Sequence, residues 1–188
     1  MSPERERLYT GLSQAAWGYF FLFFDVKWGT VSITPRFVGF LLLLSAVGKL
    51  SGERRDLALL RPLGLLLAGW TGLDWLLSWG GGSVEGRILF LDLLVSAARL
   101  YFEFQLLTDL AAIAETYQPE GVGLDGRLLR RRTEDVVLFT LLSLLASLPQ
   151  AEWRDWLMVP LMVLASVVSL LIMWNLFQLR RYFREEPA

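Results

Sequence analysis

Cysteine and histidine are both absent from the 188-residue chain. Their absence excludes disulfides, thiolate nucleophiles, zinc sites built from Cys and His, haem held by His, and His-based acid–base catalysis. The net charge is only −1, which provides neither a broad basic surface for nucleic acid nor an acidic tail. The HExxH, GxSxG and phosphate-loop motifs are also missing. We therefore expect no cofactor, no metal site and no nucleic-acid partner.

Long apolar runs, with the charges gathered between them, are the main feature of what is present. Hydrophobic residues make up 54% of the chain, and the mean hydropathy is +0.45. A helix needs roughly 20 mostly apolar residues to cross the hydrocarbon core of a bilayer. The pattern therefore predicts an all-α fold, a polytopic transmembrane helical bundle that forms a single domain with about six spans. The expected spans cover residues 8–26, 35–50, 57–79, 88–107, 128–148 and 156–179.

Two features of these spans need comment. The second and fifth have short apolar parts, which leaves open whether each crosses the bilayer fully. The first follows a charged N-terminus and contains bulky Trp17 and Tyr19 without a small-residue cleavage pattern, so we interpret it as a retained span and not a signal peptide.

The arginines and lysines predict the orientation. With the N-terminus in the cytoplasm, the inner segments hold twelve of these residues and the outer segments hold four. Short cytoplasmic loops carry an excess of Lys and Arg, so we expect a multi-pass protein with both termini inside. Five of the eight tryptophans then fall at outer span ends, as expected for a residue that prefers the membrane interface.

Asp92, Ser96, Arg99 and Glu103 form a polar stripe along the fourth expected span. At 100° per residue they lie within about 60° of one another around the helix. A charge at mid-bilayer costs about 2.5–3.5 kcal/mol on the gentlest scale, so the stripe is expected to face the bundle interior or a water-filled cavity. Arg99 and Glu103 are four residues apart and can pair. The stripe is interpreted either as a solute path or binding site, or as a buried ion pair that fixes helix packing or holds a partner subunit.

Weaker candidates lie on other spans. Asp25 and Asp74 are close to outer ends, where they either join Asp92 in an acidic site that attracts cations or simply sit among the headgroups. Asn175 and Gln178 share one side of the last span, where such amides hydrogen-bond to neighbouring helices or contribute to a site.

Two further expectations concern packing and exposure. Gly64, Ala68 and Gly72 recur at a spacing of four in the third span, which predicts close helix packing, more readily within the chain than with another subunit. Asp109 and Glu115 follow the fourth span and are expected to be solvated.

The stretch from Phe24 to Gly39 carries the pattern F-D-x(3)-G-x(3)-I-x-P-x-F-V-G. It resembles the N-terminal signature of an uncharacterised family of small bacterial six-span membrane proteins. Arg36 departs from that family, in which the residue after the proline is often acidic. The resemblance implies the bacterial cytoplasmic (inner) membrane and implies no activity. On the residues alone, Gly29 and Pro35 also fit a turn followed by a helix start.

Three function classes remain open. The first is a protein that binds or transports a small molecule or an ion through the polar stripe. The second is a non-catalytic accessory or scaffold subunit that meets another membrane protein or a second copy of itself. The third, a membrane-embedded enzyme, is less favoured because no catalytic motif is present. In each class the lipid bilayer surrounds the chain.

Overall fold

Six α-helices make up most of the protein, and one helix lies over each segment that the hydropathy pattern predicts. The computed structural model describes residues 3–24, 27–28, 31–33, 35–84, 88–148 and 152–184. A short antiparallel pair, β1 with β2, connects the first two helices. The elements are α1 (Pro3–Phe23), β1 (Lys27–Trp28), β2 (Val31–Ser32), α2 (Arg36–Leu50), α3 (Asp56–Ser78), α4 (Leu89–Tyr117), α5 (Leu124–Ser147) and α6 (Glu152–Arg181).

Local chemistry explains where two of the helices begin. Pro35 directly precedes α2 with φ of −69°, a value that its ring imposes and that suits entry into a first turn. Gly123 precedes α5 with φ of 61°, a left-handed conformation that glycine adopts without strain. Gln118 secures the same corner, because its side-chain oxygen accepts from the Leu124 amide at 2.6 Å. Its amide donates to Asp125 at 2.7 Å and holds the pKa of that carboxyl below its usual value.

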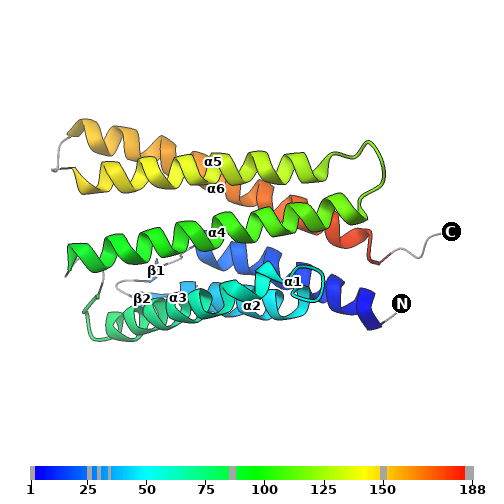
Figure 1. The fold of residues 1–188 in the computed structure, drawn as a ribbon. Coiled ribbons are helices and arrows are strands. Elements are labelled where there is room, and N and C mark those ends of the chain that lie inside the picture. The colour runs from blue at the N-terminus through cyan, green and yellow to red at the C-terminus, as the bar shows by residue number, and fades with distance from the viewer. Residues whose placement is uncertain are drawn as a thin grey trace.

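The helices form a closed ring in chain order. Each helix packs on the next, and α6 packs back on α1. Figure 1 shows both termini at one end of the bundle, together with the α2–α3 and α4–α5 connections. The other three connections lie toward the opposite end, which we call the far end. Neighbouring helices therefore run up and down alternately.

The helices at the α1–α2 connection stop short of the far end. α2 has 15 residues and α4 has 29, which correspond to about 22 Å and about 44 Å at 1.5 Å per residue. Figure 1 shows β1 and β2 within the length of the bundle, and β2 contacts α3. The hairpin thus takes the place of helical turns that α1 and α2 lack.

Small residues bring neighbouring helices close together. A Cβ added to Gly39 would lie 2.9 Å from the carbonyl oxygen of Gly18, so the α1 and α2 backbones nearly touch. A Cβ on Gly64 would lie 2.7 Å from Leu44 of α2 and 3.0 Å from Phe102 of α4. The expectation that the small residues of the third segment pack within the chain is therefore confirmed at Gly64.

The outer surface of the bundle is strongly apolar. Leu59, Phe90 and Trp156 are 74%, 75% and 81% exposed, and large hydrophobic side chains are exposed on all six helices. Within the described residues, two helical stretches are long and apolar enough to cross a membrane, Asp56–Ser78 with mean hydropathy 1.2 and Trp156–Arg181 with mean hydropathy 2.4. The helical fold is thus confirmed, whereas the number of membrane spans that the structure supports by length and composition is two and not six.

Candidate functional site

Two carboxyl groups meet in the interior of the bundle, each from the middle of its helix. Glu103 is the fifteenth of the 29 residues of α4, and Asp135 is the twelfth of the 24 residues of α5. Their exposed fractions are 1% and 2%. The two carboxyl groups lie within hydrogen-bonding reach of each other, and Oε2 of Glu103 has no hydrogen-bond donor. A buried carboxyl oxygen without a hydrogen-bond partner is rare and calls for an explanation, such as a functional role or a bound water or ion.

Arg99 supplies the positive charge beside them. Its Nε donates to Oε1 of Glu103 at 2.8 Å, one turn along α4, and the Arg99 side chain is only 17% exposed. The guanidinium lies 5.4 Å from the ring centroid of Phe23 on α1 and 5.1 Å from that of Phe139 on α5. Aromatic faces attract a cation more strongly where water is excluded. Ion pairing and two rings therefore hold the guanidinium between three helices.

Tyr19 brings a third helix to the same place. It is wholly buried on α1, and its hydroxyl has no hydrogen-bond partner. The charges that act on this hydroxyl are those of Glu103, Asp135 and Arg99. A buried hydroxyl without a partner loses its hydration without compensation. We call Tyr19, Arg99, Glu103 and Asp135 the central polar cluster.

The outer half of the predicted stripe lies farther from these groups. Asp92 and Ser96 share the face of α4 that carries Arg99 and Glu103, and both are half-buried. The structure thus brings Arg99 and Glu103 into the central polar cluster. Asp92 and Ser96 lie outside it, nearer the start of α4 at the far end. Asp25 lies outside the described residues.

The remaining predicted residues have other surroundings. Asp74 accepts from the Ser83 hydroxyl at 2.7 Å and from the Val84 amide at 2.8 Å, so it anchors the connection between α3 and α4. Gln178 accepts from Arg127 of α5 at 3.4 Å. Asn175 is buried on α6.

One expectation about exposure is wrong. Asp109 is 5% exposed, whereas Glu115 is exposed as predicted. Asp109 accepts from the Gln105 amide at 3.2 Å, and burial raises the pKa of its carboxyl. α4 continues to Tyr117, as the helix was expected to do, but Asp109 lies on a part of it that packs against other helices, so its side chain is buried instead of solvated.

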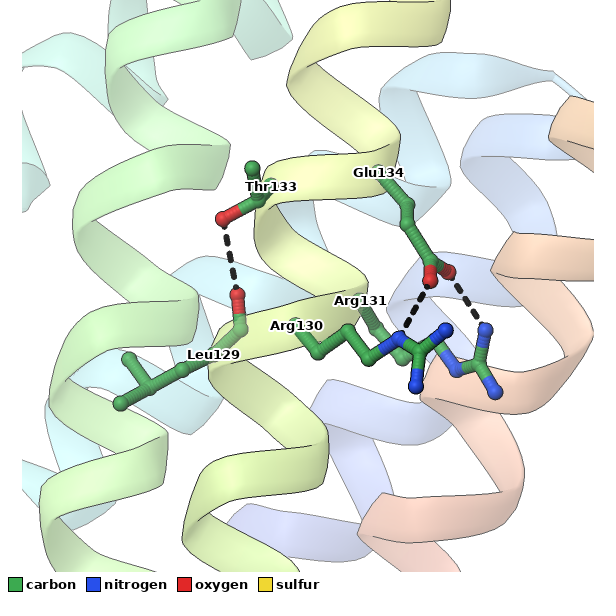
Figure 2. A network of polar contacts seen from close by, with 5 residues as sticks. All are labelled: Leu129, Arg130, Arg131, Thr133 and Glu134. Carbon is green, nitrogen blue, oxygen red and sulfur yellow. Dashed lines mark hydrogen bonds and ion pairs between the residues drawn. The ribbon is translucent and has the colours of Figure 1, made fainter.

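Asp135 was missed by the sequence analysis, although the sequence contains a signal for it. The arginines just before it suggest a headgroup region, and Glu134 fits that reading. Figure 2 shows Glu134 between Arg130 and Arg131, with Nε of Arg130 at 3.0 Å. Asp135, the next residue, points elsewhere, because it shares a helical face with buried Leu124, Leu128 and Leu138. An acid on the apolar face of an amphipathic helix is the signal that was available.

Comparison with known proteins adds no further information. No family model, curated protein or solved structure matches the chain. The resemblance of residues 24–39 to a bacterial family therefore stays a prediction.

Proposed function

We propose that the chain is a six-span protein of the bacterial cytoplasmic membrane that binds or transports a small solute or ion at the central polar cluster. The observation that carries the proposal is a charged cluster at the midpoints of α4 and α5, inside a bundle whose outer surface is apolar. Charged residues at such a depth in a membrane protein are retained mainly where they serve a substrate, an ion or a proton.

The exposed apolar surface supports the membrane part of the proposal. Soluble monomers rarely expose contiguous apolar patches of more than a few hundred Å². In the most apolar 18 residues of the two stretches Asp56–Ser78 and Trp156–Arg181, only 28% and 22% of the residues are buried inside the bundle. Exposed Trp79, Trp153 and Trp156 gather at the far end, where an aromatic belt at the outer interface would lie.

Charged residues that face inward explain why α4 falls short as an isolated membrane span, whereas α5 falls short mainly because arginines and Glu134 also occupy its first half. A hydropathy window counts Arg99, Glu103 and Asp135 as unfavourable wherever they point. In the ring these residues face other helices, while Phe90, Leu94 and Leu144 face outward. Lipid would then contact an apolar surface on these helices too.

Single-cysteine labelling distinguishes six spans from two. The chain has no cysteine, so each variant carries one reactive thiol. Ser83 lies between α3 and α4, and Glu120 lies between α4 and α5. We expect a membrane-impermeant maleimide to label Ser83→Cys in intact cells, and to label Glu120→Cys only after the membrane is opened. If only α3 and α6 cross, both positions lie on one side and label alike, which would refute the six-span topology.

Ion flux in proteoliposomes tests the transport part. With a potassium diffusion potential and an entrapped pH dye as the probe, we expect wild-type protein to dissipate the imposed gradients faster than empty vesicles. Asp135→Asn, which keeps the shape of the side chain and removes its charge, should reduce the rate at least several-fold. Glu115→Gln, at an exposed position, is the matched control and should leave the rate unchanged. Equal rates for wild type, Asp135→Asn and empty vesicles would contradict a transport function.

One observation favours an accessory or scaffold subunit as the second candidate. Arg99 is held by Glu103 and by the rings of Phe23 and Phe139, all from this chain, as expected of an ion pair that only fixes helix packing. This candidate predicts a folded, monodisperse chain that dissipates no gradient. A membrane-embedded enzyme remains the least favoured class, because the sequence contains no HExxH, GxSxG or phosphate-loop motif.

A further inference from the structure

The charges of the central polar cluster do not balance. Two carboxyl groups, Glu103 and Asp135, face one guanidinium, that of Arg99. Arg99 forms its ion pair with Glu103, and no ion pair to Asp135 is present among the described side chains. The neighbouring Glu134 shows the contrast, since two arginines hold it near the surface of the same helix. Two adjacent carboxylates in a low-dielectric interior cannot both stay ionised against a single cation.

Among the described residues, the cation whose charge acts on Asp135 is that of Arg99. Half-buried Arg132 lies three residues before Asp135 on α5. Its guanidinium, however, donates to the Thr108 hydroxyl at 2.7 Å and lies 4.1 Å from the ring centroid of Phe104. The buried residues of α1, α2, α3 and α6 are uncharged, and Tyr19 is the titratable one among them. Phe40 of α2 packs on Phe102 of α4 with ring centroids 5.9 Å apart, and Gly64 of α3 faces the same ring. The other buried acid, Asp109, lies six residues along α4, about 9 Å away.

The unsatisfied atoms indicate what is missing. As two carboxylates, Glu103 and Asp135 offer each other no hydrogen-bond donor, although they lie within hydrogen-bonding reach. Oε2 of Glu103 and the hydroxyl oxygen of Tyr19 are fully buried without a partner. A proton on either carboxyl would supply a donor between the two groups and would remove the excess negative charge.

We propose that Glu103 and Asp135 together bind one exchangeable proton, which makes the central polar cluster a proton-binding site inside the bundle. The proton forms an O–H bond on one carboxyl oxygen and a hydrogen bond to the other carboxyl. The buried Tyr19 hydroxyl lies near this pair, where the charges of both carboxyl groups act on it, and makes no hydrogen bond to them. The inference rests on the proposed function and names its ligand: the ion that the cluster binds is a proton, so any solute that the protein moves would be coupled to protons.

Infrared spectroscopy of the protein in lipid nanodiscs tests the inference. A protonated carboxyl gives a carbonyl stretch separate from the bands of carboxylates and amides. Because Asp109 is also buried, with a raised pKa, the measurement uses the Asp109→Asn variant as its background. In that background we expect one protonated carboxyl per chain at pH 7. Its band should shift in D₂O, because the proton exchanges. Labelling with ¹³C-aspartate, which changes no side chain, shows whether Asp135 carries the proton.

Further substitutions fix the position of the proton. Adding Asp135→Asn should abolish the band, and adding Tyr19→Phe should move its frequency because a neighbouring hydroxyl is lost. Adding Glu115→Gln, the exposed control, should change nothing. The inference is overturned if the Asp109→Asn background shows no protonated carboxyl. It is also overturned if the band never exchanges in D₂O, or if sodium or potassium ions raise the melting temperature while no band is present, since a metal ion would then occupy the site.

The test separates this inference from the proposed function. A missing band together with flux that depends on Asp135 would refute the proton and leave transport standing. An exchangeable band in a protein that dissipates no gradient would refute transport and leave the proton-binding site standing.

Discussion

Arg99→Leu is expected to destabilise the protein by about 3–5 kcal/mol, because it removes one partner of a buried ion pair and leaves the other uncompensated. Glu103 is 1% exposed, and its carboxylate would lose the Arg99 Nε–H donor that now lies 2.8 Å from its Oε1. The rings of Phe23 and Phe139 would also lose the cation that they flank. Unfolding by denaturant in detergent, followed by the fluorescence of the eight tryptophans, measures the change.

The same substitution at Arg130 is a matched control. Arg130 also pairs with a glutamate four residues along a helix, at 3.0 Å, but its side chain is 77% exposed. Exposed pairs of this kind contribute less than about 1 kcal/mol. The double variant Arg99→Leu/Glu103→Leu should be more stable than Arg99→Leu alone, because it removes the unpaired carboxylate. Equal losses for Arg99→Leu and Arg130→Leu would show that the interior of the bundle is wet, which contradicts a buried cluster.

Gly39→Ala is expected to destabilise the bundle by about 1–3 kcal/mol through overpacking. The new Cβ would lie 2.9 Å from the carbonyl oxygen of Gly18, a distance that such contacts do not tolerate. The obstructing atom belongs to the backbone, so no side-chain rotation relieves the contact. Relief requires α1 and α2 to move apart along their crossing, and thermal unfolding in detergent measures the consequence.

Gly69→Ala is the matched control for Gly39→Ala. Gly69 lies within α3, and nothing lies within 4 Å of a Cβ added there. Alanine favours a helix interior over glycine by about 1 kcal/mol, so this variant should be slightly more stable than wild type. If Gly39→Ala also gained stability, helix propensity would outweigh packing, and the close approach of α1 and α2 would be refuted.

Several features of the fold and the cluster follow from local sequence. All six helical segments are visible in the sequence. Apolar runs identify them, and Pro35 and the glycines near residues 80 and 123 mark where some of them begin or end. The inward face of α4 is visible because Arg99 and Glu103 share one side of the helix, and a buried charge must turn toward other helices. The pairing of Arg99 with Glu103 follows for the same reason, since four residues separate them.

Other features depend on contacts between distant segments. Asp135 lies 32 residues after Glu103, and Tyr19 lies 84 residues before Glu103. No local pattern therefore brings the three residues together. Their meeting requires the ring order of the helices, which periodicity does not encode. The solvated position expected for Asp109 was wrong for the same reason: its burial depends on which helices pack against the last turns of α4, which is a property of the assembled bundle.

The sequence by itself thus determined the helices and the direction in which the α4 stripe faces, because both follow from residues within a few helical turns. Its composition alone determined the absence of Cys and His chemistry. Only the tertiary structure decided that a second carboxyl and a tyrosine hydroxyl meet that stripe. The physical reason is that ionic contacts inside a bundle are set by which helices pack side by side. That arrangement depends on close approaches such as Gly18 on Gly39 and Gly64 on Phe102, which lie far apart in the chain.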